Sequence, residues 1–136
     1  MYNPTKPYKN QILRLIQSTW DTPSVRVRSG VYPVITKKFS GLEIQHTDGI
    51  GTKGWYHWKK QSLQSAVIDA MAMNLNDMAM AGAVPYAILD HMMLPDAGER
   101  VVLKIVRELV KICQAYTIAI VGGETSHHNT MDALDI

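Results

Sequence analysis

A glycine-rich turn with one carboxylate and one lysine carries the clearest chemical signal in the sequence. It reads Asp48-Gly-Ile-Gly-Thr-Lys53. Glycines let backbone N–H groups surround an anion, and the lysine adds positive charge. A carboxylate 4 Å from a bare phosphate charge would repel it, by about 1 kcal/mol in water and about 4 kcal/mol at an effective dielectric of 20. A divalent cation between them reverses that sign, so Asp48 favours magnesium with a polyphosphate.

The bland alternative for this turn is an ordinary Gly-rich hairpin with Asp48 and Lys53 at the surface. The turn also differs from a Walker P-loop, in which the glycines and lysine have another spacing and a helix begins at the lysine. The turn alone therefore does not decide between the two interpretations.

Polar residues also lie on a helix predicted over residues 61–81, which is otherwise mostly apolar. Asp69 and Asn76 are seven residues apart and lie nearly one above the other, with Asp77 about 80° round the helix from Asp69. Polar groups on a buried helix need protein partners or a metal ion. Alternatively, Asn76 and Asp77 face water near the helix end, where the dipole disfavours a carboxylate by about 0.3–1 kcal/mol.

A third candidate, Gly122-Gly-Glu-Thr-Ser126, follows a short buried strand predicted over residues 117–121. The glycine pair is predicted to end that strand. A carboxylate and two hydroxyls just beyond it suit a ligand site at a strand end, but many ordinary turns have this composition.

Histidine and cysteine offer weaker sites. His127 and His128, together with His46, suggest zinc, but adjacent histidines rarely bind one ion and no metal-ligand spacing supports them. Cys113 is the single cysteine, so no internal disulfide or Cys-based zinc site is possible. It lies in an apolar helical stripe, which is typical of a buried, inert thiol.

Hydrophobic periodicity predicts the elements that must position these residues. Helices are expected over residues 8–20, 61–81 and 96–116, strands over 31–36, 42–47, 86–93 and 117–121, and irregular structure over 21–30. This order predicts a layered α/β (α+β) domain with four main strands and two long helices. Residues 132–136 look like the start of another strand, so we expect more chain to follow.

Composition supports one domain with a real core. The 136 residues are 46% hydrophobic and 19% charged, which excludes disorder and leaves no room for a second full domain. A net charge of +2 is too small to predict nucleic acid or an anionic membrane as a partner. The N-terminus lacks an apolar targeting core, so we expect a cytoplasmic protein with no nucleic-acid and no membrane partner.

Taken together, four ordered motifs resemble the N-terminal half of aminoimidazole ribonucleotide synthetase, also called phosphoribosylformylglycinamidine cyclo-ligase. They lie within residues 42–125 and read Thr47-Asp-Gly-Ile-Gly-Thr-Lys53, Asn76-Asp77 with Ala81-Gly-Ala-Val-Pro85, Leu89-Asp90, and Val121-Gly-Gly-Glu-Thr125. The wording of the first and last motifs favours this family over formylglycinamidine synthetase, thiamine monophosphate kinase, selenophosphate synthetase and a hydrogenase maturation factor.

The resemblance implies an ATP- and magnesium-dependent cyclo-ligase of purine biosynthesis, which converts formylglycinamidine ribonucleotide to aminoimidazole ribonucleotide with ADP and phosphate. It implies an ATP-binding and dimerisation domain over residues 31–136, after an N-terminal helix and irregular segment over residues 1–30. It further implies a homodimer whose sheets close into a β-barrel near ATP. The family's second domain is absent, so we expect this chain alone to be weakly active or inactive.

Carried over by position, the resemblance implies that Asp48, Asp77 and Glu124 bind the metal and that Lys53 contacts phosphate. Asp69 and Asn76 are expected to support these groups, and no catalytic residue is predicted. The full ATP- and phosphate-binding set consists of Asp48, Gly49, Gly51, Thr52, Lys53, Asn76, Gly122, Gly123, Glu124 and Thr125.

One departure concerns the phosphate lid. Residues 25–33 contain a single glycine where the family has a mobile Gly-rich loop, so either the lid is missing or Arg26 and Arg28 replace it. Two other functions stay open: a kinase-like or otherwise related ATP-using enzyme acting on another small molecule, and a non-catalytic dimerisation module.

Overall fold

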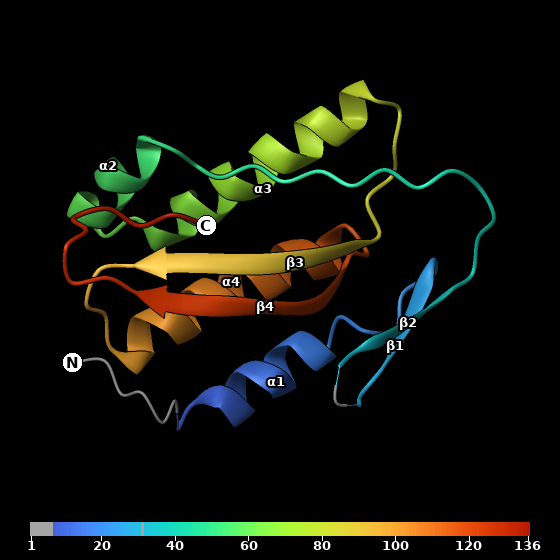
Figure 1. The fold of residues 1–136 in the computed structure, drawn as a ribbon, viewed down its shortest axis with the longest axis horizontal. Coiled ribbons are helices and arrows are strands. Elements are labelled where there is room, and N and C mark those ends of the chain that lie inside the picture. Colours follow the sequence, from blue (N-terminus) through green and yellow to red (C-terminus); the bar gives the residue numbers. More distant parts are fainter. Residues whose placement is uncertain (1–6, 31) are drawn as a thin grey trace.

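The computed structural model describes residues 7–30 and 32–136. Its elements, in chain order, are α1 (Lys9–Gln17), β1 (Val25–Arg28), β2 (Val34–Lys37), α2 (Lys53–Lys60), α3 (Leu63–Met80), β3 (Ala87–Leu94), α4 (Glu99–Ala115) and β4 (Ala119–His127) (Figure 1).

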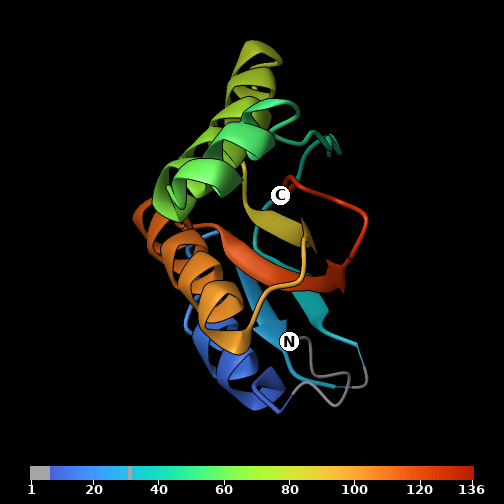
Figure 2. The ribbon, with the colours of Figure 1, turned by 90° about the vertical axis from the view of Figure 1, so that its left-hand side faces the viewer.

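Two small sheets organise the chain. β3 and β4 run parallel, whereas β1 and β2 form a separate antiparallel hairpin. α1, α3 and α4 lie on one side of the β3–β4 pair. The extended segment of residues 42–47 and the C-terminal residues lie on the other side (Figure 2). The mixed α/β class is therefore confirmed. Closure of the sheets into a barrel by a second copy stays a prediction, since it involves more than one chain.

Helix α4 forms the centre of the core. Apolar residues recur every three or four positions along it, which is the spacing of one helix face. Its buried side chains include Val102, Ile105, Val106, Leu109 and Cys113. Burial raises the pKa of the Cys113 thiol to about 12, so this thiol is protonated at neutral pH, as an inert core residue should be.

Helix α3 matches its prediction closely, because Ala and Met are strong helix formers throughout it. Gly82 follows with a φ of 68°, a conformation that glycine adopts without strain and that commonly ends a helix. In the described residues, no helix is both long and apolar enough to cross a membrane.

Strand β4 differs from its prediction, because it continues through Gly122 and Gly123 to His127. Gly123 pairs with Asp90 of β3, and a Cβ on Gly123 would lie 2.1 Å from the Asp90 carbonyl oxygen. The glycine pair therefore permits a close strand approach inside the sheet. The same region contains a register irregularity between Ile88 and Leu89.

The strand predicted over residues 42–47 is wrong, because this segment is extended but belongs to no sheet. Figure 1 shows it running past α3 without a neighbouring strand. Leu42 is fully exposed and Ile44 is 48% exposed. Its alternation of apolar and polar residues fits a strand, but no strand in the described part of the chain pairs with it.

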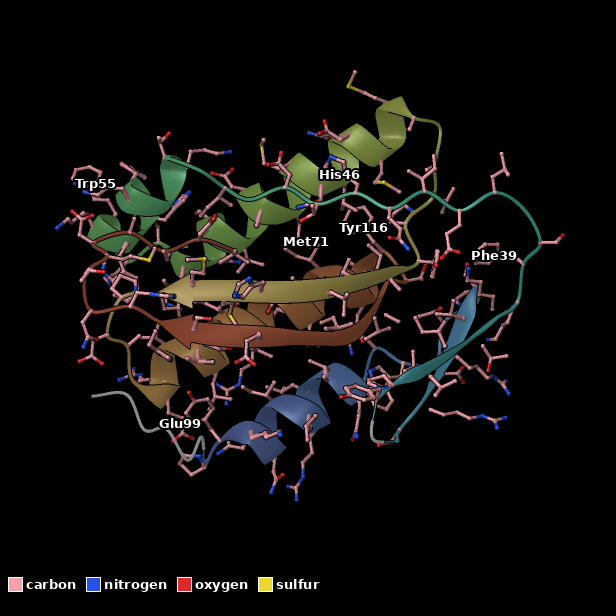
Figure 3. All side chains as sticks on the ribbon, viewed as in Figure 1. Phe39, His46, Trp55, Met71, Glu99 and Tyr116 are labelled. Atoms are coloured by element: carbon pink, nitrogen blue, oxygen red, sulfur yellow. The ribbon has the colours of Figure 1, made fainter. Side chains whose placement is uncertain are left out.

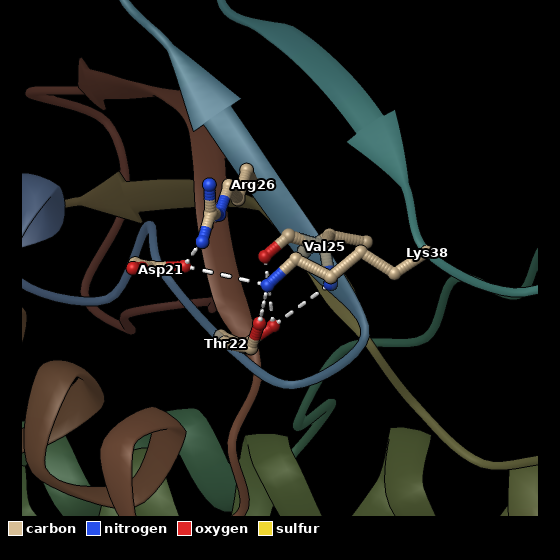
Figure 4. A network of polar contacts seen from close by, with 5 residues as sticks. All are labelled: Asp21, Thr22, Val25, Arg26 and Lys38. Atoms are coloured by element: carbon tan, nitrogen blue, oxygen red, sulfur yellow. Dashed lines mark hydrogen bonds and ion pairs between the residues drawn. The ribbon is translucent and has the colours of Figure 1, made fainter.

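The predicted irregular segment is also corrected, since Val25–Arg28 forms β1 and pairs with β2. Figure 4 shows the contacts that anchor this hairpin. Asp21 lies 3.3 Å from Arg26 and 3.4 Å from Lys38, and Lys38 also donates to the Thr22 carbonyl at 2.6 Å. The β1–β2 pair is thereby tied to the chain that leaves α1.

Candidate functional site

The glycine-rich turn leads directly into α2, which begins at Lys53 with Thr52 at its N-cap. The expectation that no helix opens at the lysine is therefore wrong. Gly51 has a φ of 59°, which glycine tolerates and which lets the turn enter the helix. The Thr52 hydroxyl makes no capping bond. A helix N-terminus carries positive partial charge and suits an anion, so the geometry strengthens the phosphate interpretation.

Asn74 of α3 holds the turn in place. It belongs to the polar residues of the predicted helix, but no role was expected for it. The Asp48 backbone N–H donates to Asn74 Oδ1 at 3.0 Å, and Asn74 Nδ2 donates to the Asp48 carbonyl at 2.9 Å. Asn74 Nδ2 also donates to the Ala70 carbonyl at 3.0 Å. A polar side chain on a mostly apolar helix is a signal that the sequence does show, but the partner of that side chain lies far away in the chain.

The Asp48 carboxylate is exposed, and one of its oxygens accepts the Gly49 N–H at 2.8 Å. Asp77 lies near the C-terminal end of α3, three residues after Asn74, and its carboxylate is 3.1 Å from His46 Nε2. His46 Nδ1 in turn lies 3.2 Å from Asn74 Oδ1, and its side chain lies beside α3 (Figure 3). Asp48 and Asp77 are thus linked through Asn74 and His46.

Lys53 lies close to Asp69, the residue that the resemblance implies as a supporting group. The two lie 3.5 Å apart, and Asp69 also lies 2.9 Å from Nε2 of the buried His57. The hydrogen bond from His57 lowers the pKa of Asp69, and the charge of Lys53 adds to this effect. His57 Nδ1 is 2.9 Å from the Ser62 hydroxyl. His57 was another residue that the sequence did not single out.

The C-terminal residues return to cover the turn. A Cβ on Gly49 would lie 2.7 Å from a carboxylate oxygen of Asp135, and a Cβ on Gly54 would lie 1.8 Å from the Leu134 carbonyl oxygen. Asp135 pairs with Met93 through two backbone hydrogen bonds of 2.8 and 2.9 Å. Asp135 therefore places a third carboxylate beside the motif, which the sequence did not predict.

Gly122, Gly123, Glu124 and Thr125 lie within β4, where Glu124 is paired with His91 of β3. They line a cavity beneath α1, while Asp48 and Lys53 lie in the turn before α2. Asn76 is exposed on α3. The predicted nucleotide-binding set therefore occupies two regions of the chain.

No group of three or more His, Cys, Asp or Glu side chains in the described part of the chain is arranged to hold a metal ion. Asp48, Asp77 and Glu124 therefore do not form a ready-made cage. Magnesium typically takes one or two carboxylates and completes its shell with water and phosphate oxygens. Asp48 and Asp77 are both exposed carboxylates, and Asn74 and His46 link the Asp48 backbone to Asp77, which fits that requirement.

The two arginines proposed as a lid differ in their contacts. Arg26 is paired with Asp21. Arg28 ends β1 and is exposed. Replacement of the lid by these arginines stays a prediction.

Replacing Asn74 with alanine is expected to lower the free energy of unfolding by about 1–2 kcal/mol, because it leaves two backbone groups of Asp48 without their partner. Hydrogen exchange at the Asp48 amide should accelerate by more than the global loss of stability explains. Asn76→Ala is the matched control, since Asn76 is exposed on the same helix. Equal exchange rates in both variants would contradict the assigned role.

Comparison with known proteins agrees with the motifs. Phosphoribosylformylglycinamidine cyclo-ligase of Saccharolobus solfataricus is 32% identical over 119 residues, which is 88% of this chain and 36% of that protein. The protein of the same name from Sulfurisphaera tokodaii is 37% identical over 124 residues, covering 91% and 37% respectively. The chain thus spans little more than a third of the length of these two relatives.

A solved structure of Escherichia coli HypE superimposes over 93% of this chain and 40% of that chain, with 18% identity and a TM-score of 0.49. That likeness is too low to support an inference. The family model described as "AIR synthase related protein, N-terminal domain" matches residues 38–136, which is most of the chain. The chain therefore belongs to the AIR synthase related protein family, as its N-terminal domain.

Proposed function

We propose that this chain is the ATP-binding part of a cyclo-ligase of purine biosynthesis. The complete enzyme would convert formylglycinamidine ribonucleotide to aminoimidazole ribonucleotide, with release of ADP and phosphate. The observation that carries this proposal is the Asp48–Asn74 clamp, which fixes a glycine turn at the N-terminus of α2. The names of the relatives supply the reaction.

In this proposal the α2 N-terminus and Lys53 bind the phosphates of ATP. Asp48 and Asp77 hold magnesium, which would neutralise the charge that develops on the transferred phosphoryl group. Asp69, with His57 behind it, orients Lys53 until phosphate takes its place. Gly122, Gly123, Glu124 and Thr125 form a second region of nucleotide contacts, with Glu124 as a further metal ligand.

We further propose a cytoplasmic homodimer. Leu89 is 76% exposed on β3, and Leu42 and Ile44 lie on an extended segment without a sheet partner. Unpaired extended chain beside exposed apolar side chains favours association with another strand. A second copy that covers this side of the β3–β4 sheet would satisfy both.

Calorimetric titration with magnesium-ATP tests the nucleotide site directly. The wild-type chain should bind, and Asp48→Asn should weaken binding at least tenfold, because it removes a charge from the metal site. Asp21→Asn is the matched control, since Asp21 lies beside the β1–β2 hairpin. Failure of a folded wild-type protein to bind, or equal affinity in Asp48→Asn, would reject the site.

A further inference from the structure

A cavity of about 440 Å³ lies between α1 and the β3–β4 sheet, on the side of the sheet opposite the exposed Leu89. Its walls are mainly apolar, and Ser29, Gly30 and Pro33 also line it. The apolar lining comes from α1, both strands and α4 and includes Ile12, Ile16, Met92, Val106, Leu109 and Ile120.

Asp90 places a carboxylate in this mainly apolar wall. It lies between Ile88 and Met92 on the face of β3 that is turned toward the helices, because side chains alternate along a strand. It is partly exposed in the cavity wall, and burial of its carboxyl raises its pKa to about 7. No hydrogen bond or ion pair to this carboxylate occurs among the described residues. A carboxylate in a mainly apolar wall that has no donor from the protein can accept hydrogen bonds from a ligand in the cavity.

The other charged groups of the cavity define what would fit. Lys9 contributes one positive charge on an exposed part of α1, and Glu124 adds a second carboxylate from β4. The phenol of Tyr8 also lines the cavity, and the protonated Cys113 thiol of α4 lies within electrostatic range of Asp90. The cavity thus combines an apolar body with a negatively charged wall, a combination that favours small organic cations.

We propose that this cavity is a binding site for a small molecule that joins an apolar, preferably planar, body to an ammonium or amidinium group. The cationic group would donate to Asp90, and the body would pack between α1 and α4. This site shares no residue with the turn before α2, but its lining includes Gly122, Gly123, Glu124 and Thr125, the second region of proposed nucleotide contacts. The inference does not depend on the proposed phosphate and metal site at Asp48 and Lys53.

Benzamidine is a suitable probe, with benzamide as its uncharged analogue and benzoate as its anionic analogue. Titration of the ¹⁵N-labelled chain should shift the amides of Met92, Gly122 and Gly123, with benzamidine binding at least tenfold more tightly than benzamide and benzoate not binding. Asp90→Asn should remove the preference for benzamidine. Asp96→Asn, which changes an exposed carboxylate outside the cavity, should retain it.

A second variant tests the cavity and not the charge. Ile12→Trp fills space from the α1 side and leaves Asp90 in place, so it should weaken benzamidine binding at least fivefold. The proposal is overturned if the folded wild-type chain shows no shifts with benzamidine, if the shifts map to α2 and α3, or if Asp90→Asn retains the wild-type preference.

Discussion

Replacing Asp90 with asparagine is expected to raise the free energy of unfolding by about 2–4 kcal/mol at pH 8. Burial raises the pKa of Asp90 to about 7 from its ordinary value of 3.8. The folded state therefore holds the Asp90 proton more tightly than the unfolded state does. Ionisation at neutral pH then costs stability, and the neutral amide avoids this cost.

The pH dependence has a definite direction. Below about pH 4 the carboxyl is protonated in both states, and its contribution to stability is fully retained. Stability is then lost by up to about 1.4 kcal/mol per pH unit as the pH rises toward 7, and the loss levels off above that value. Urea unfolding of wild type and Asp90→Asn from pH 5 to 8 should show a widening and then constant difference.

Asp96→Asn, which removes an exposed carboxylate, is the control for this series. Parallel curves for Asp90→Asn and wild type would contradict the prediction, because they would mean that Asp90 has the same pKa in the folded and unfolded states. The same variant serves in the ligand experiment, so its folding is checked independently of binding.

The long helices were predictable because each has a periodic apolar face or a run of strong helix formers. α2 was not, since three glycines precede or enter it and its Trp and Tyr residues are poor local evidence for a helix. The strand predicted over residues 42–47 failed for a non-local reason: its alternation is correct, but pairing depends on another edge. Gly122 and Gly123 were misjudged because a glycine serves a close strand contact as readily as a turn.

The residues of the candidate site also fall into those that local sequence patterns predict and those that depend on distant contacts. Asp48, Lys53, Asp69 and Asp77 were identified from residue type and spacing, because a glycine turn and a polar helix stripe are local patterns. The roles of Asn74, His57 and Asp135 were not predicted, since each owes its role to a contact with a residue distant in sequence. Asn74 reaches back 26 residues to Asp48, and Asp135 meets the turn from the end of the chain.

At Gly54, helix propensity and a contact with a residue distant in sequence predict opposite changes in stability for Gly54→Ala. Gly54 lies in the first turn of α2, where helix propensity alone predicts that Gly54→Ala gains up to about 1 kcal/mol. A Cβ at this position would instead lie 1.8 Å from the Leu134 carbonyl oxygen. That oxygen belongs to backbone held by the pairing of Asp135 with Met93. We therefore expect Gly54→Ala to lower the free energy of unfolding by about 2–4 kcal/mol.

The damage should begin at the C-terminal residues, because they can move away more easily than α2 can. Hydrogen exchange should then show early loss of protection at the Asp135 amide, which donates to Met93, while α4 stays protected. Gly98→Ala is the control, since nothing lies within 4 Å of its added Cβ. A Gly54→Ala protein as stable as wild type would mean that the C-terminal residues do not cover the turn in solution, and the carboxylate of Asp135 would then have no part in the site.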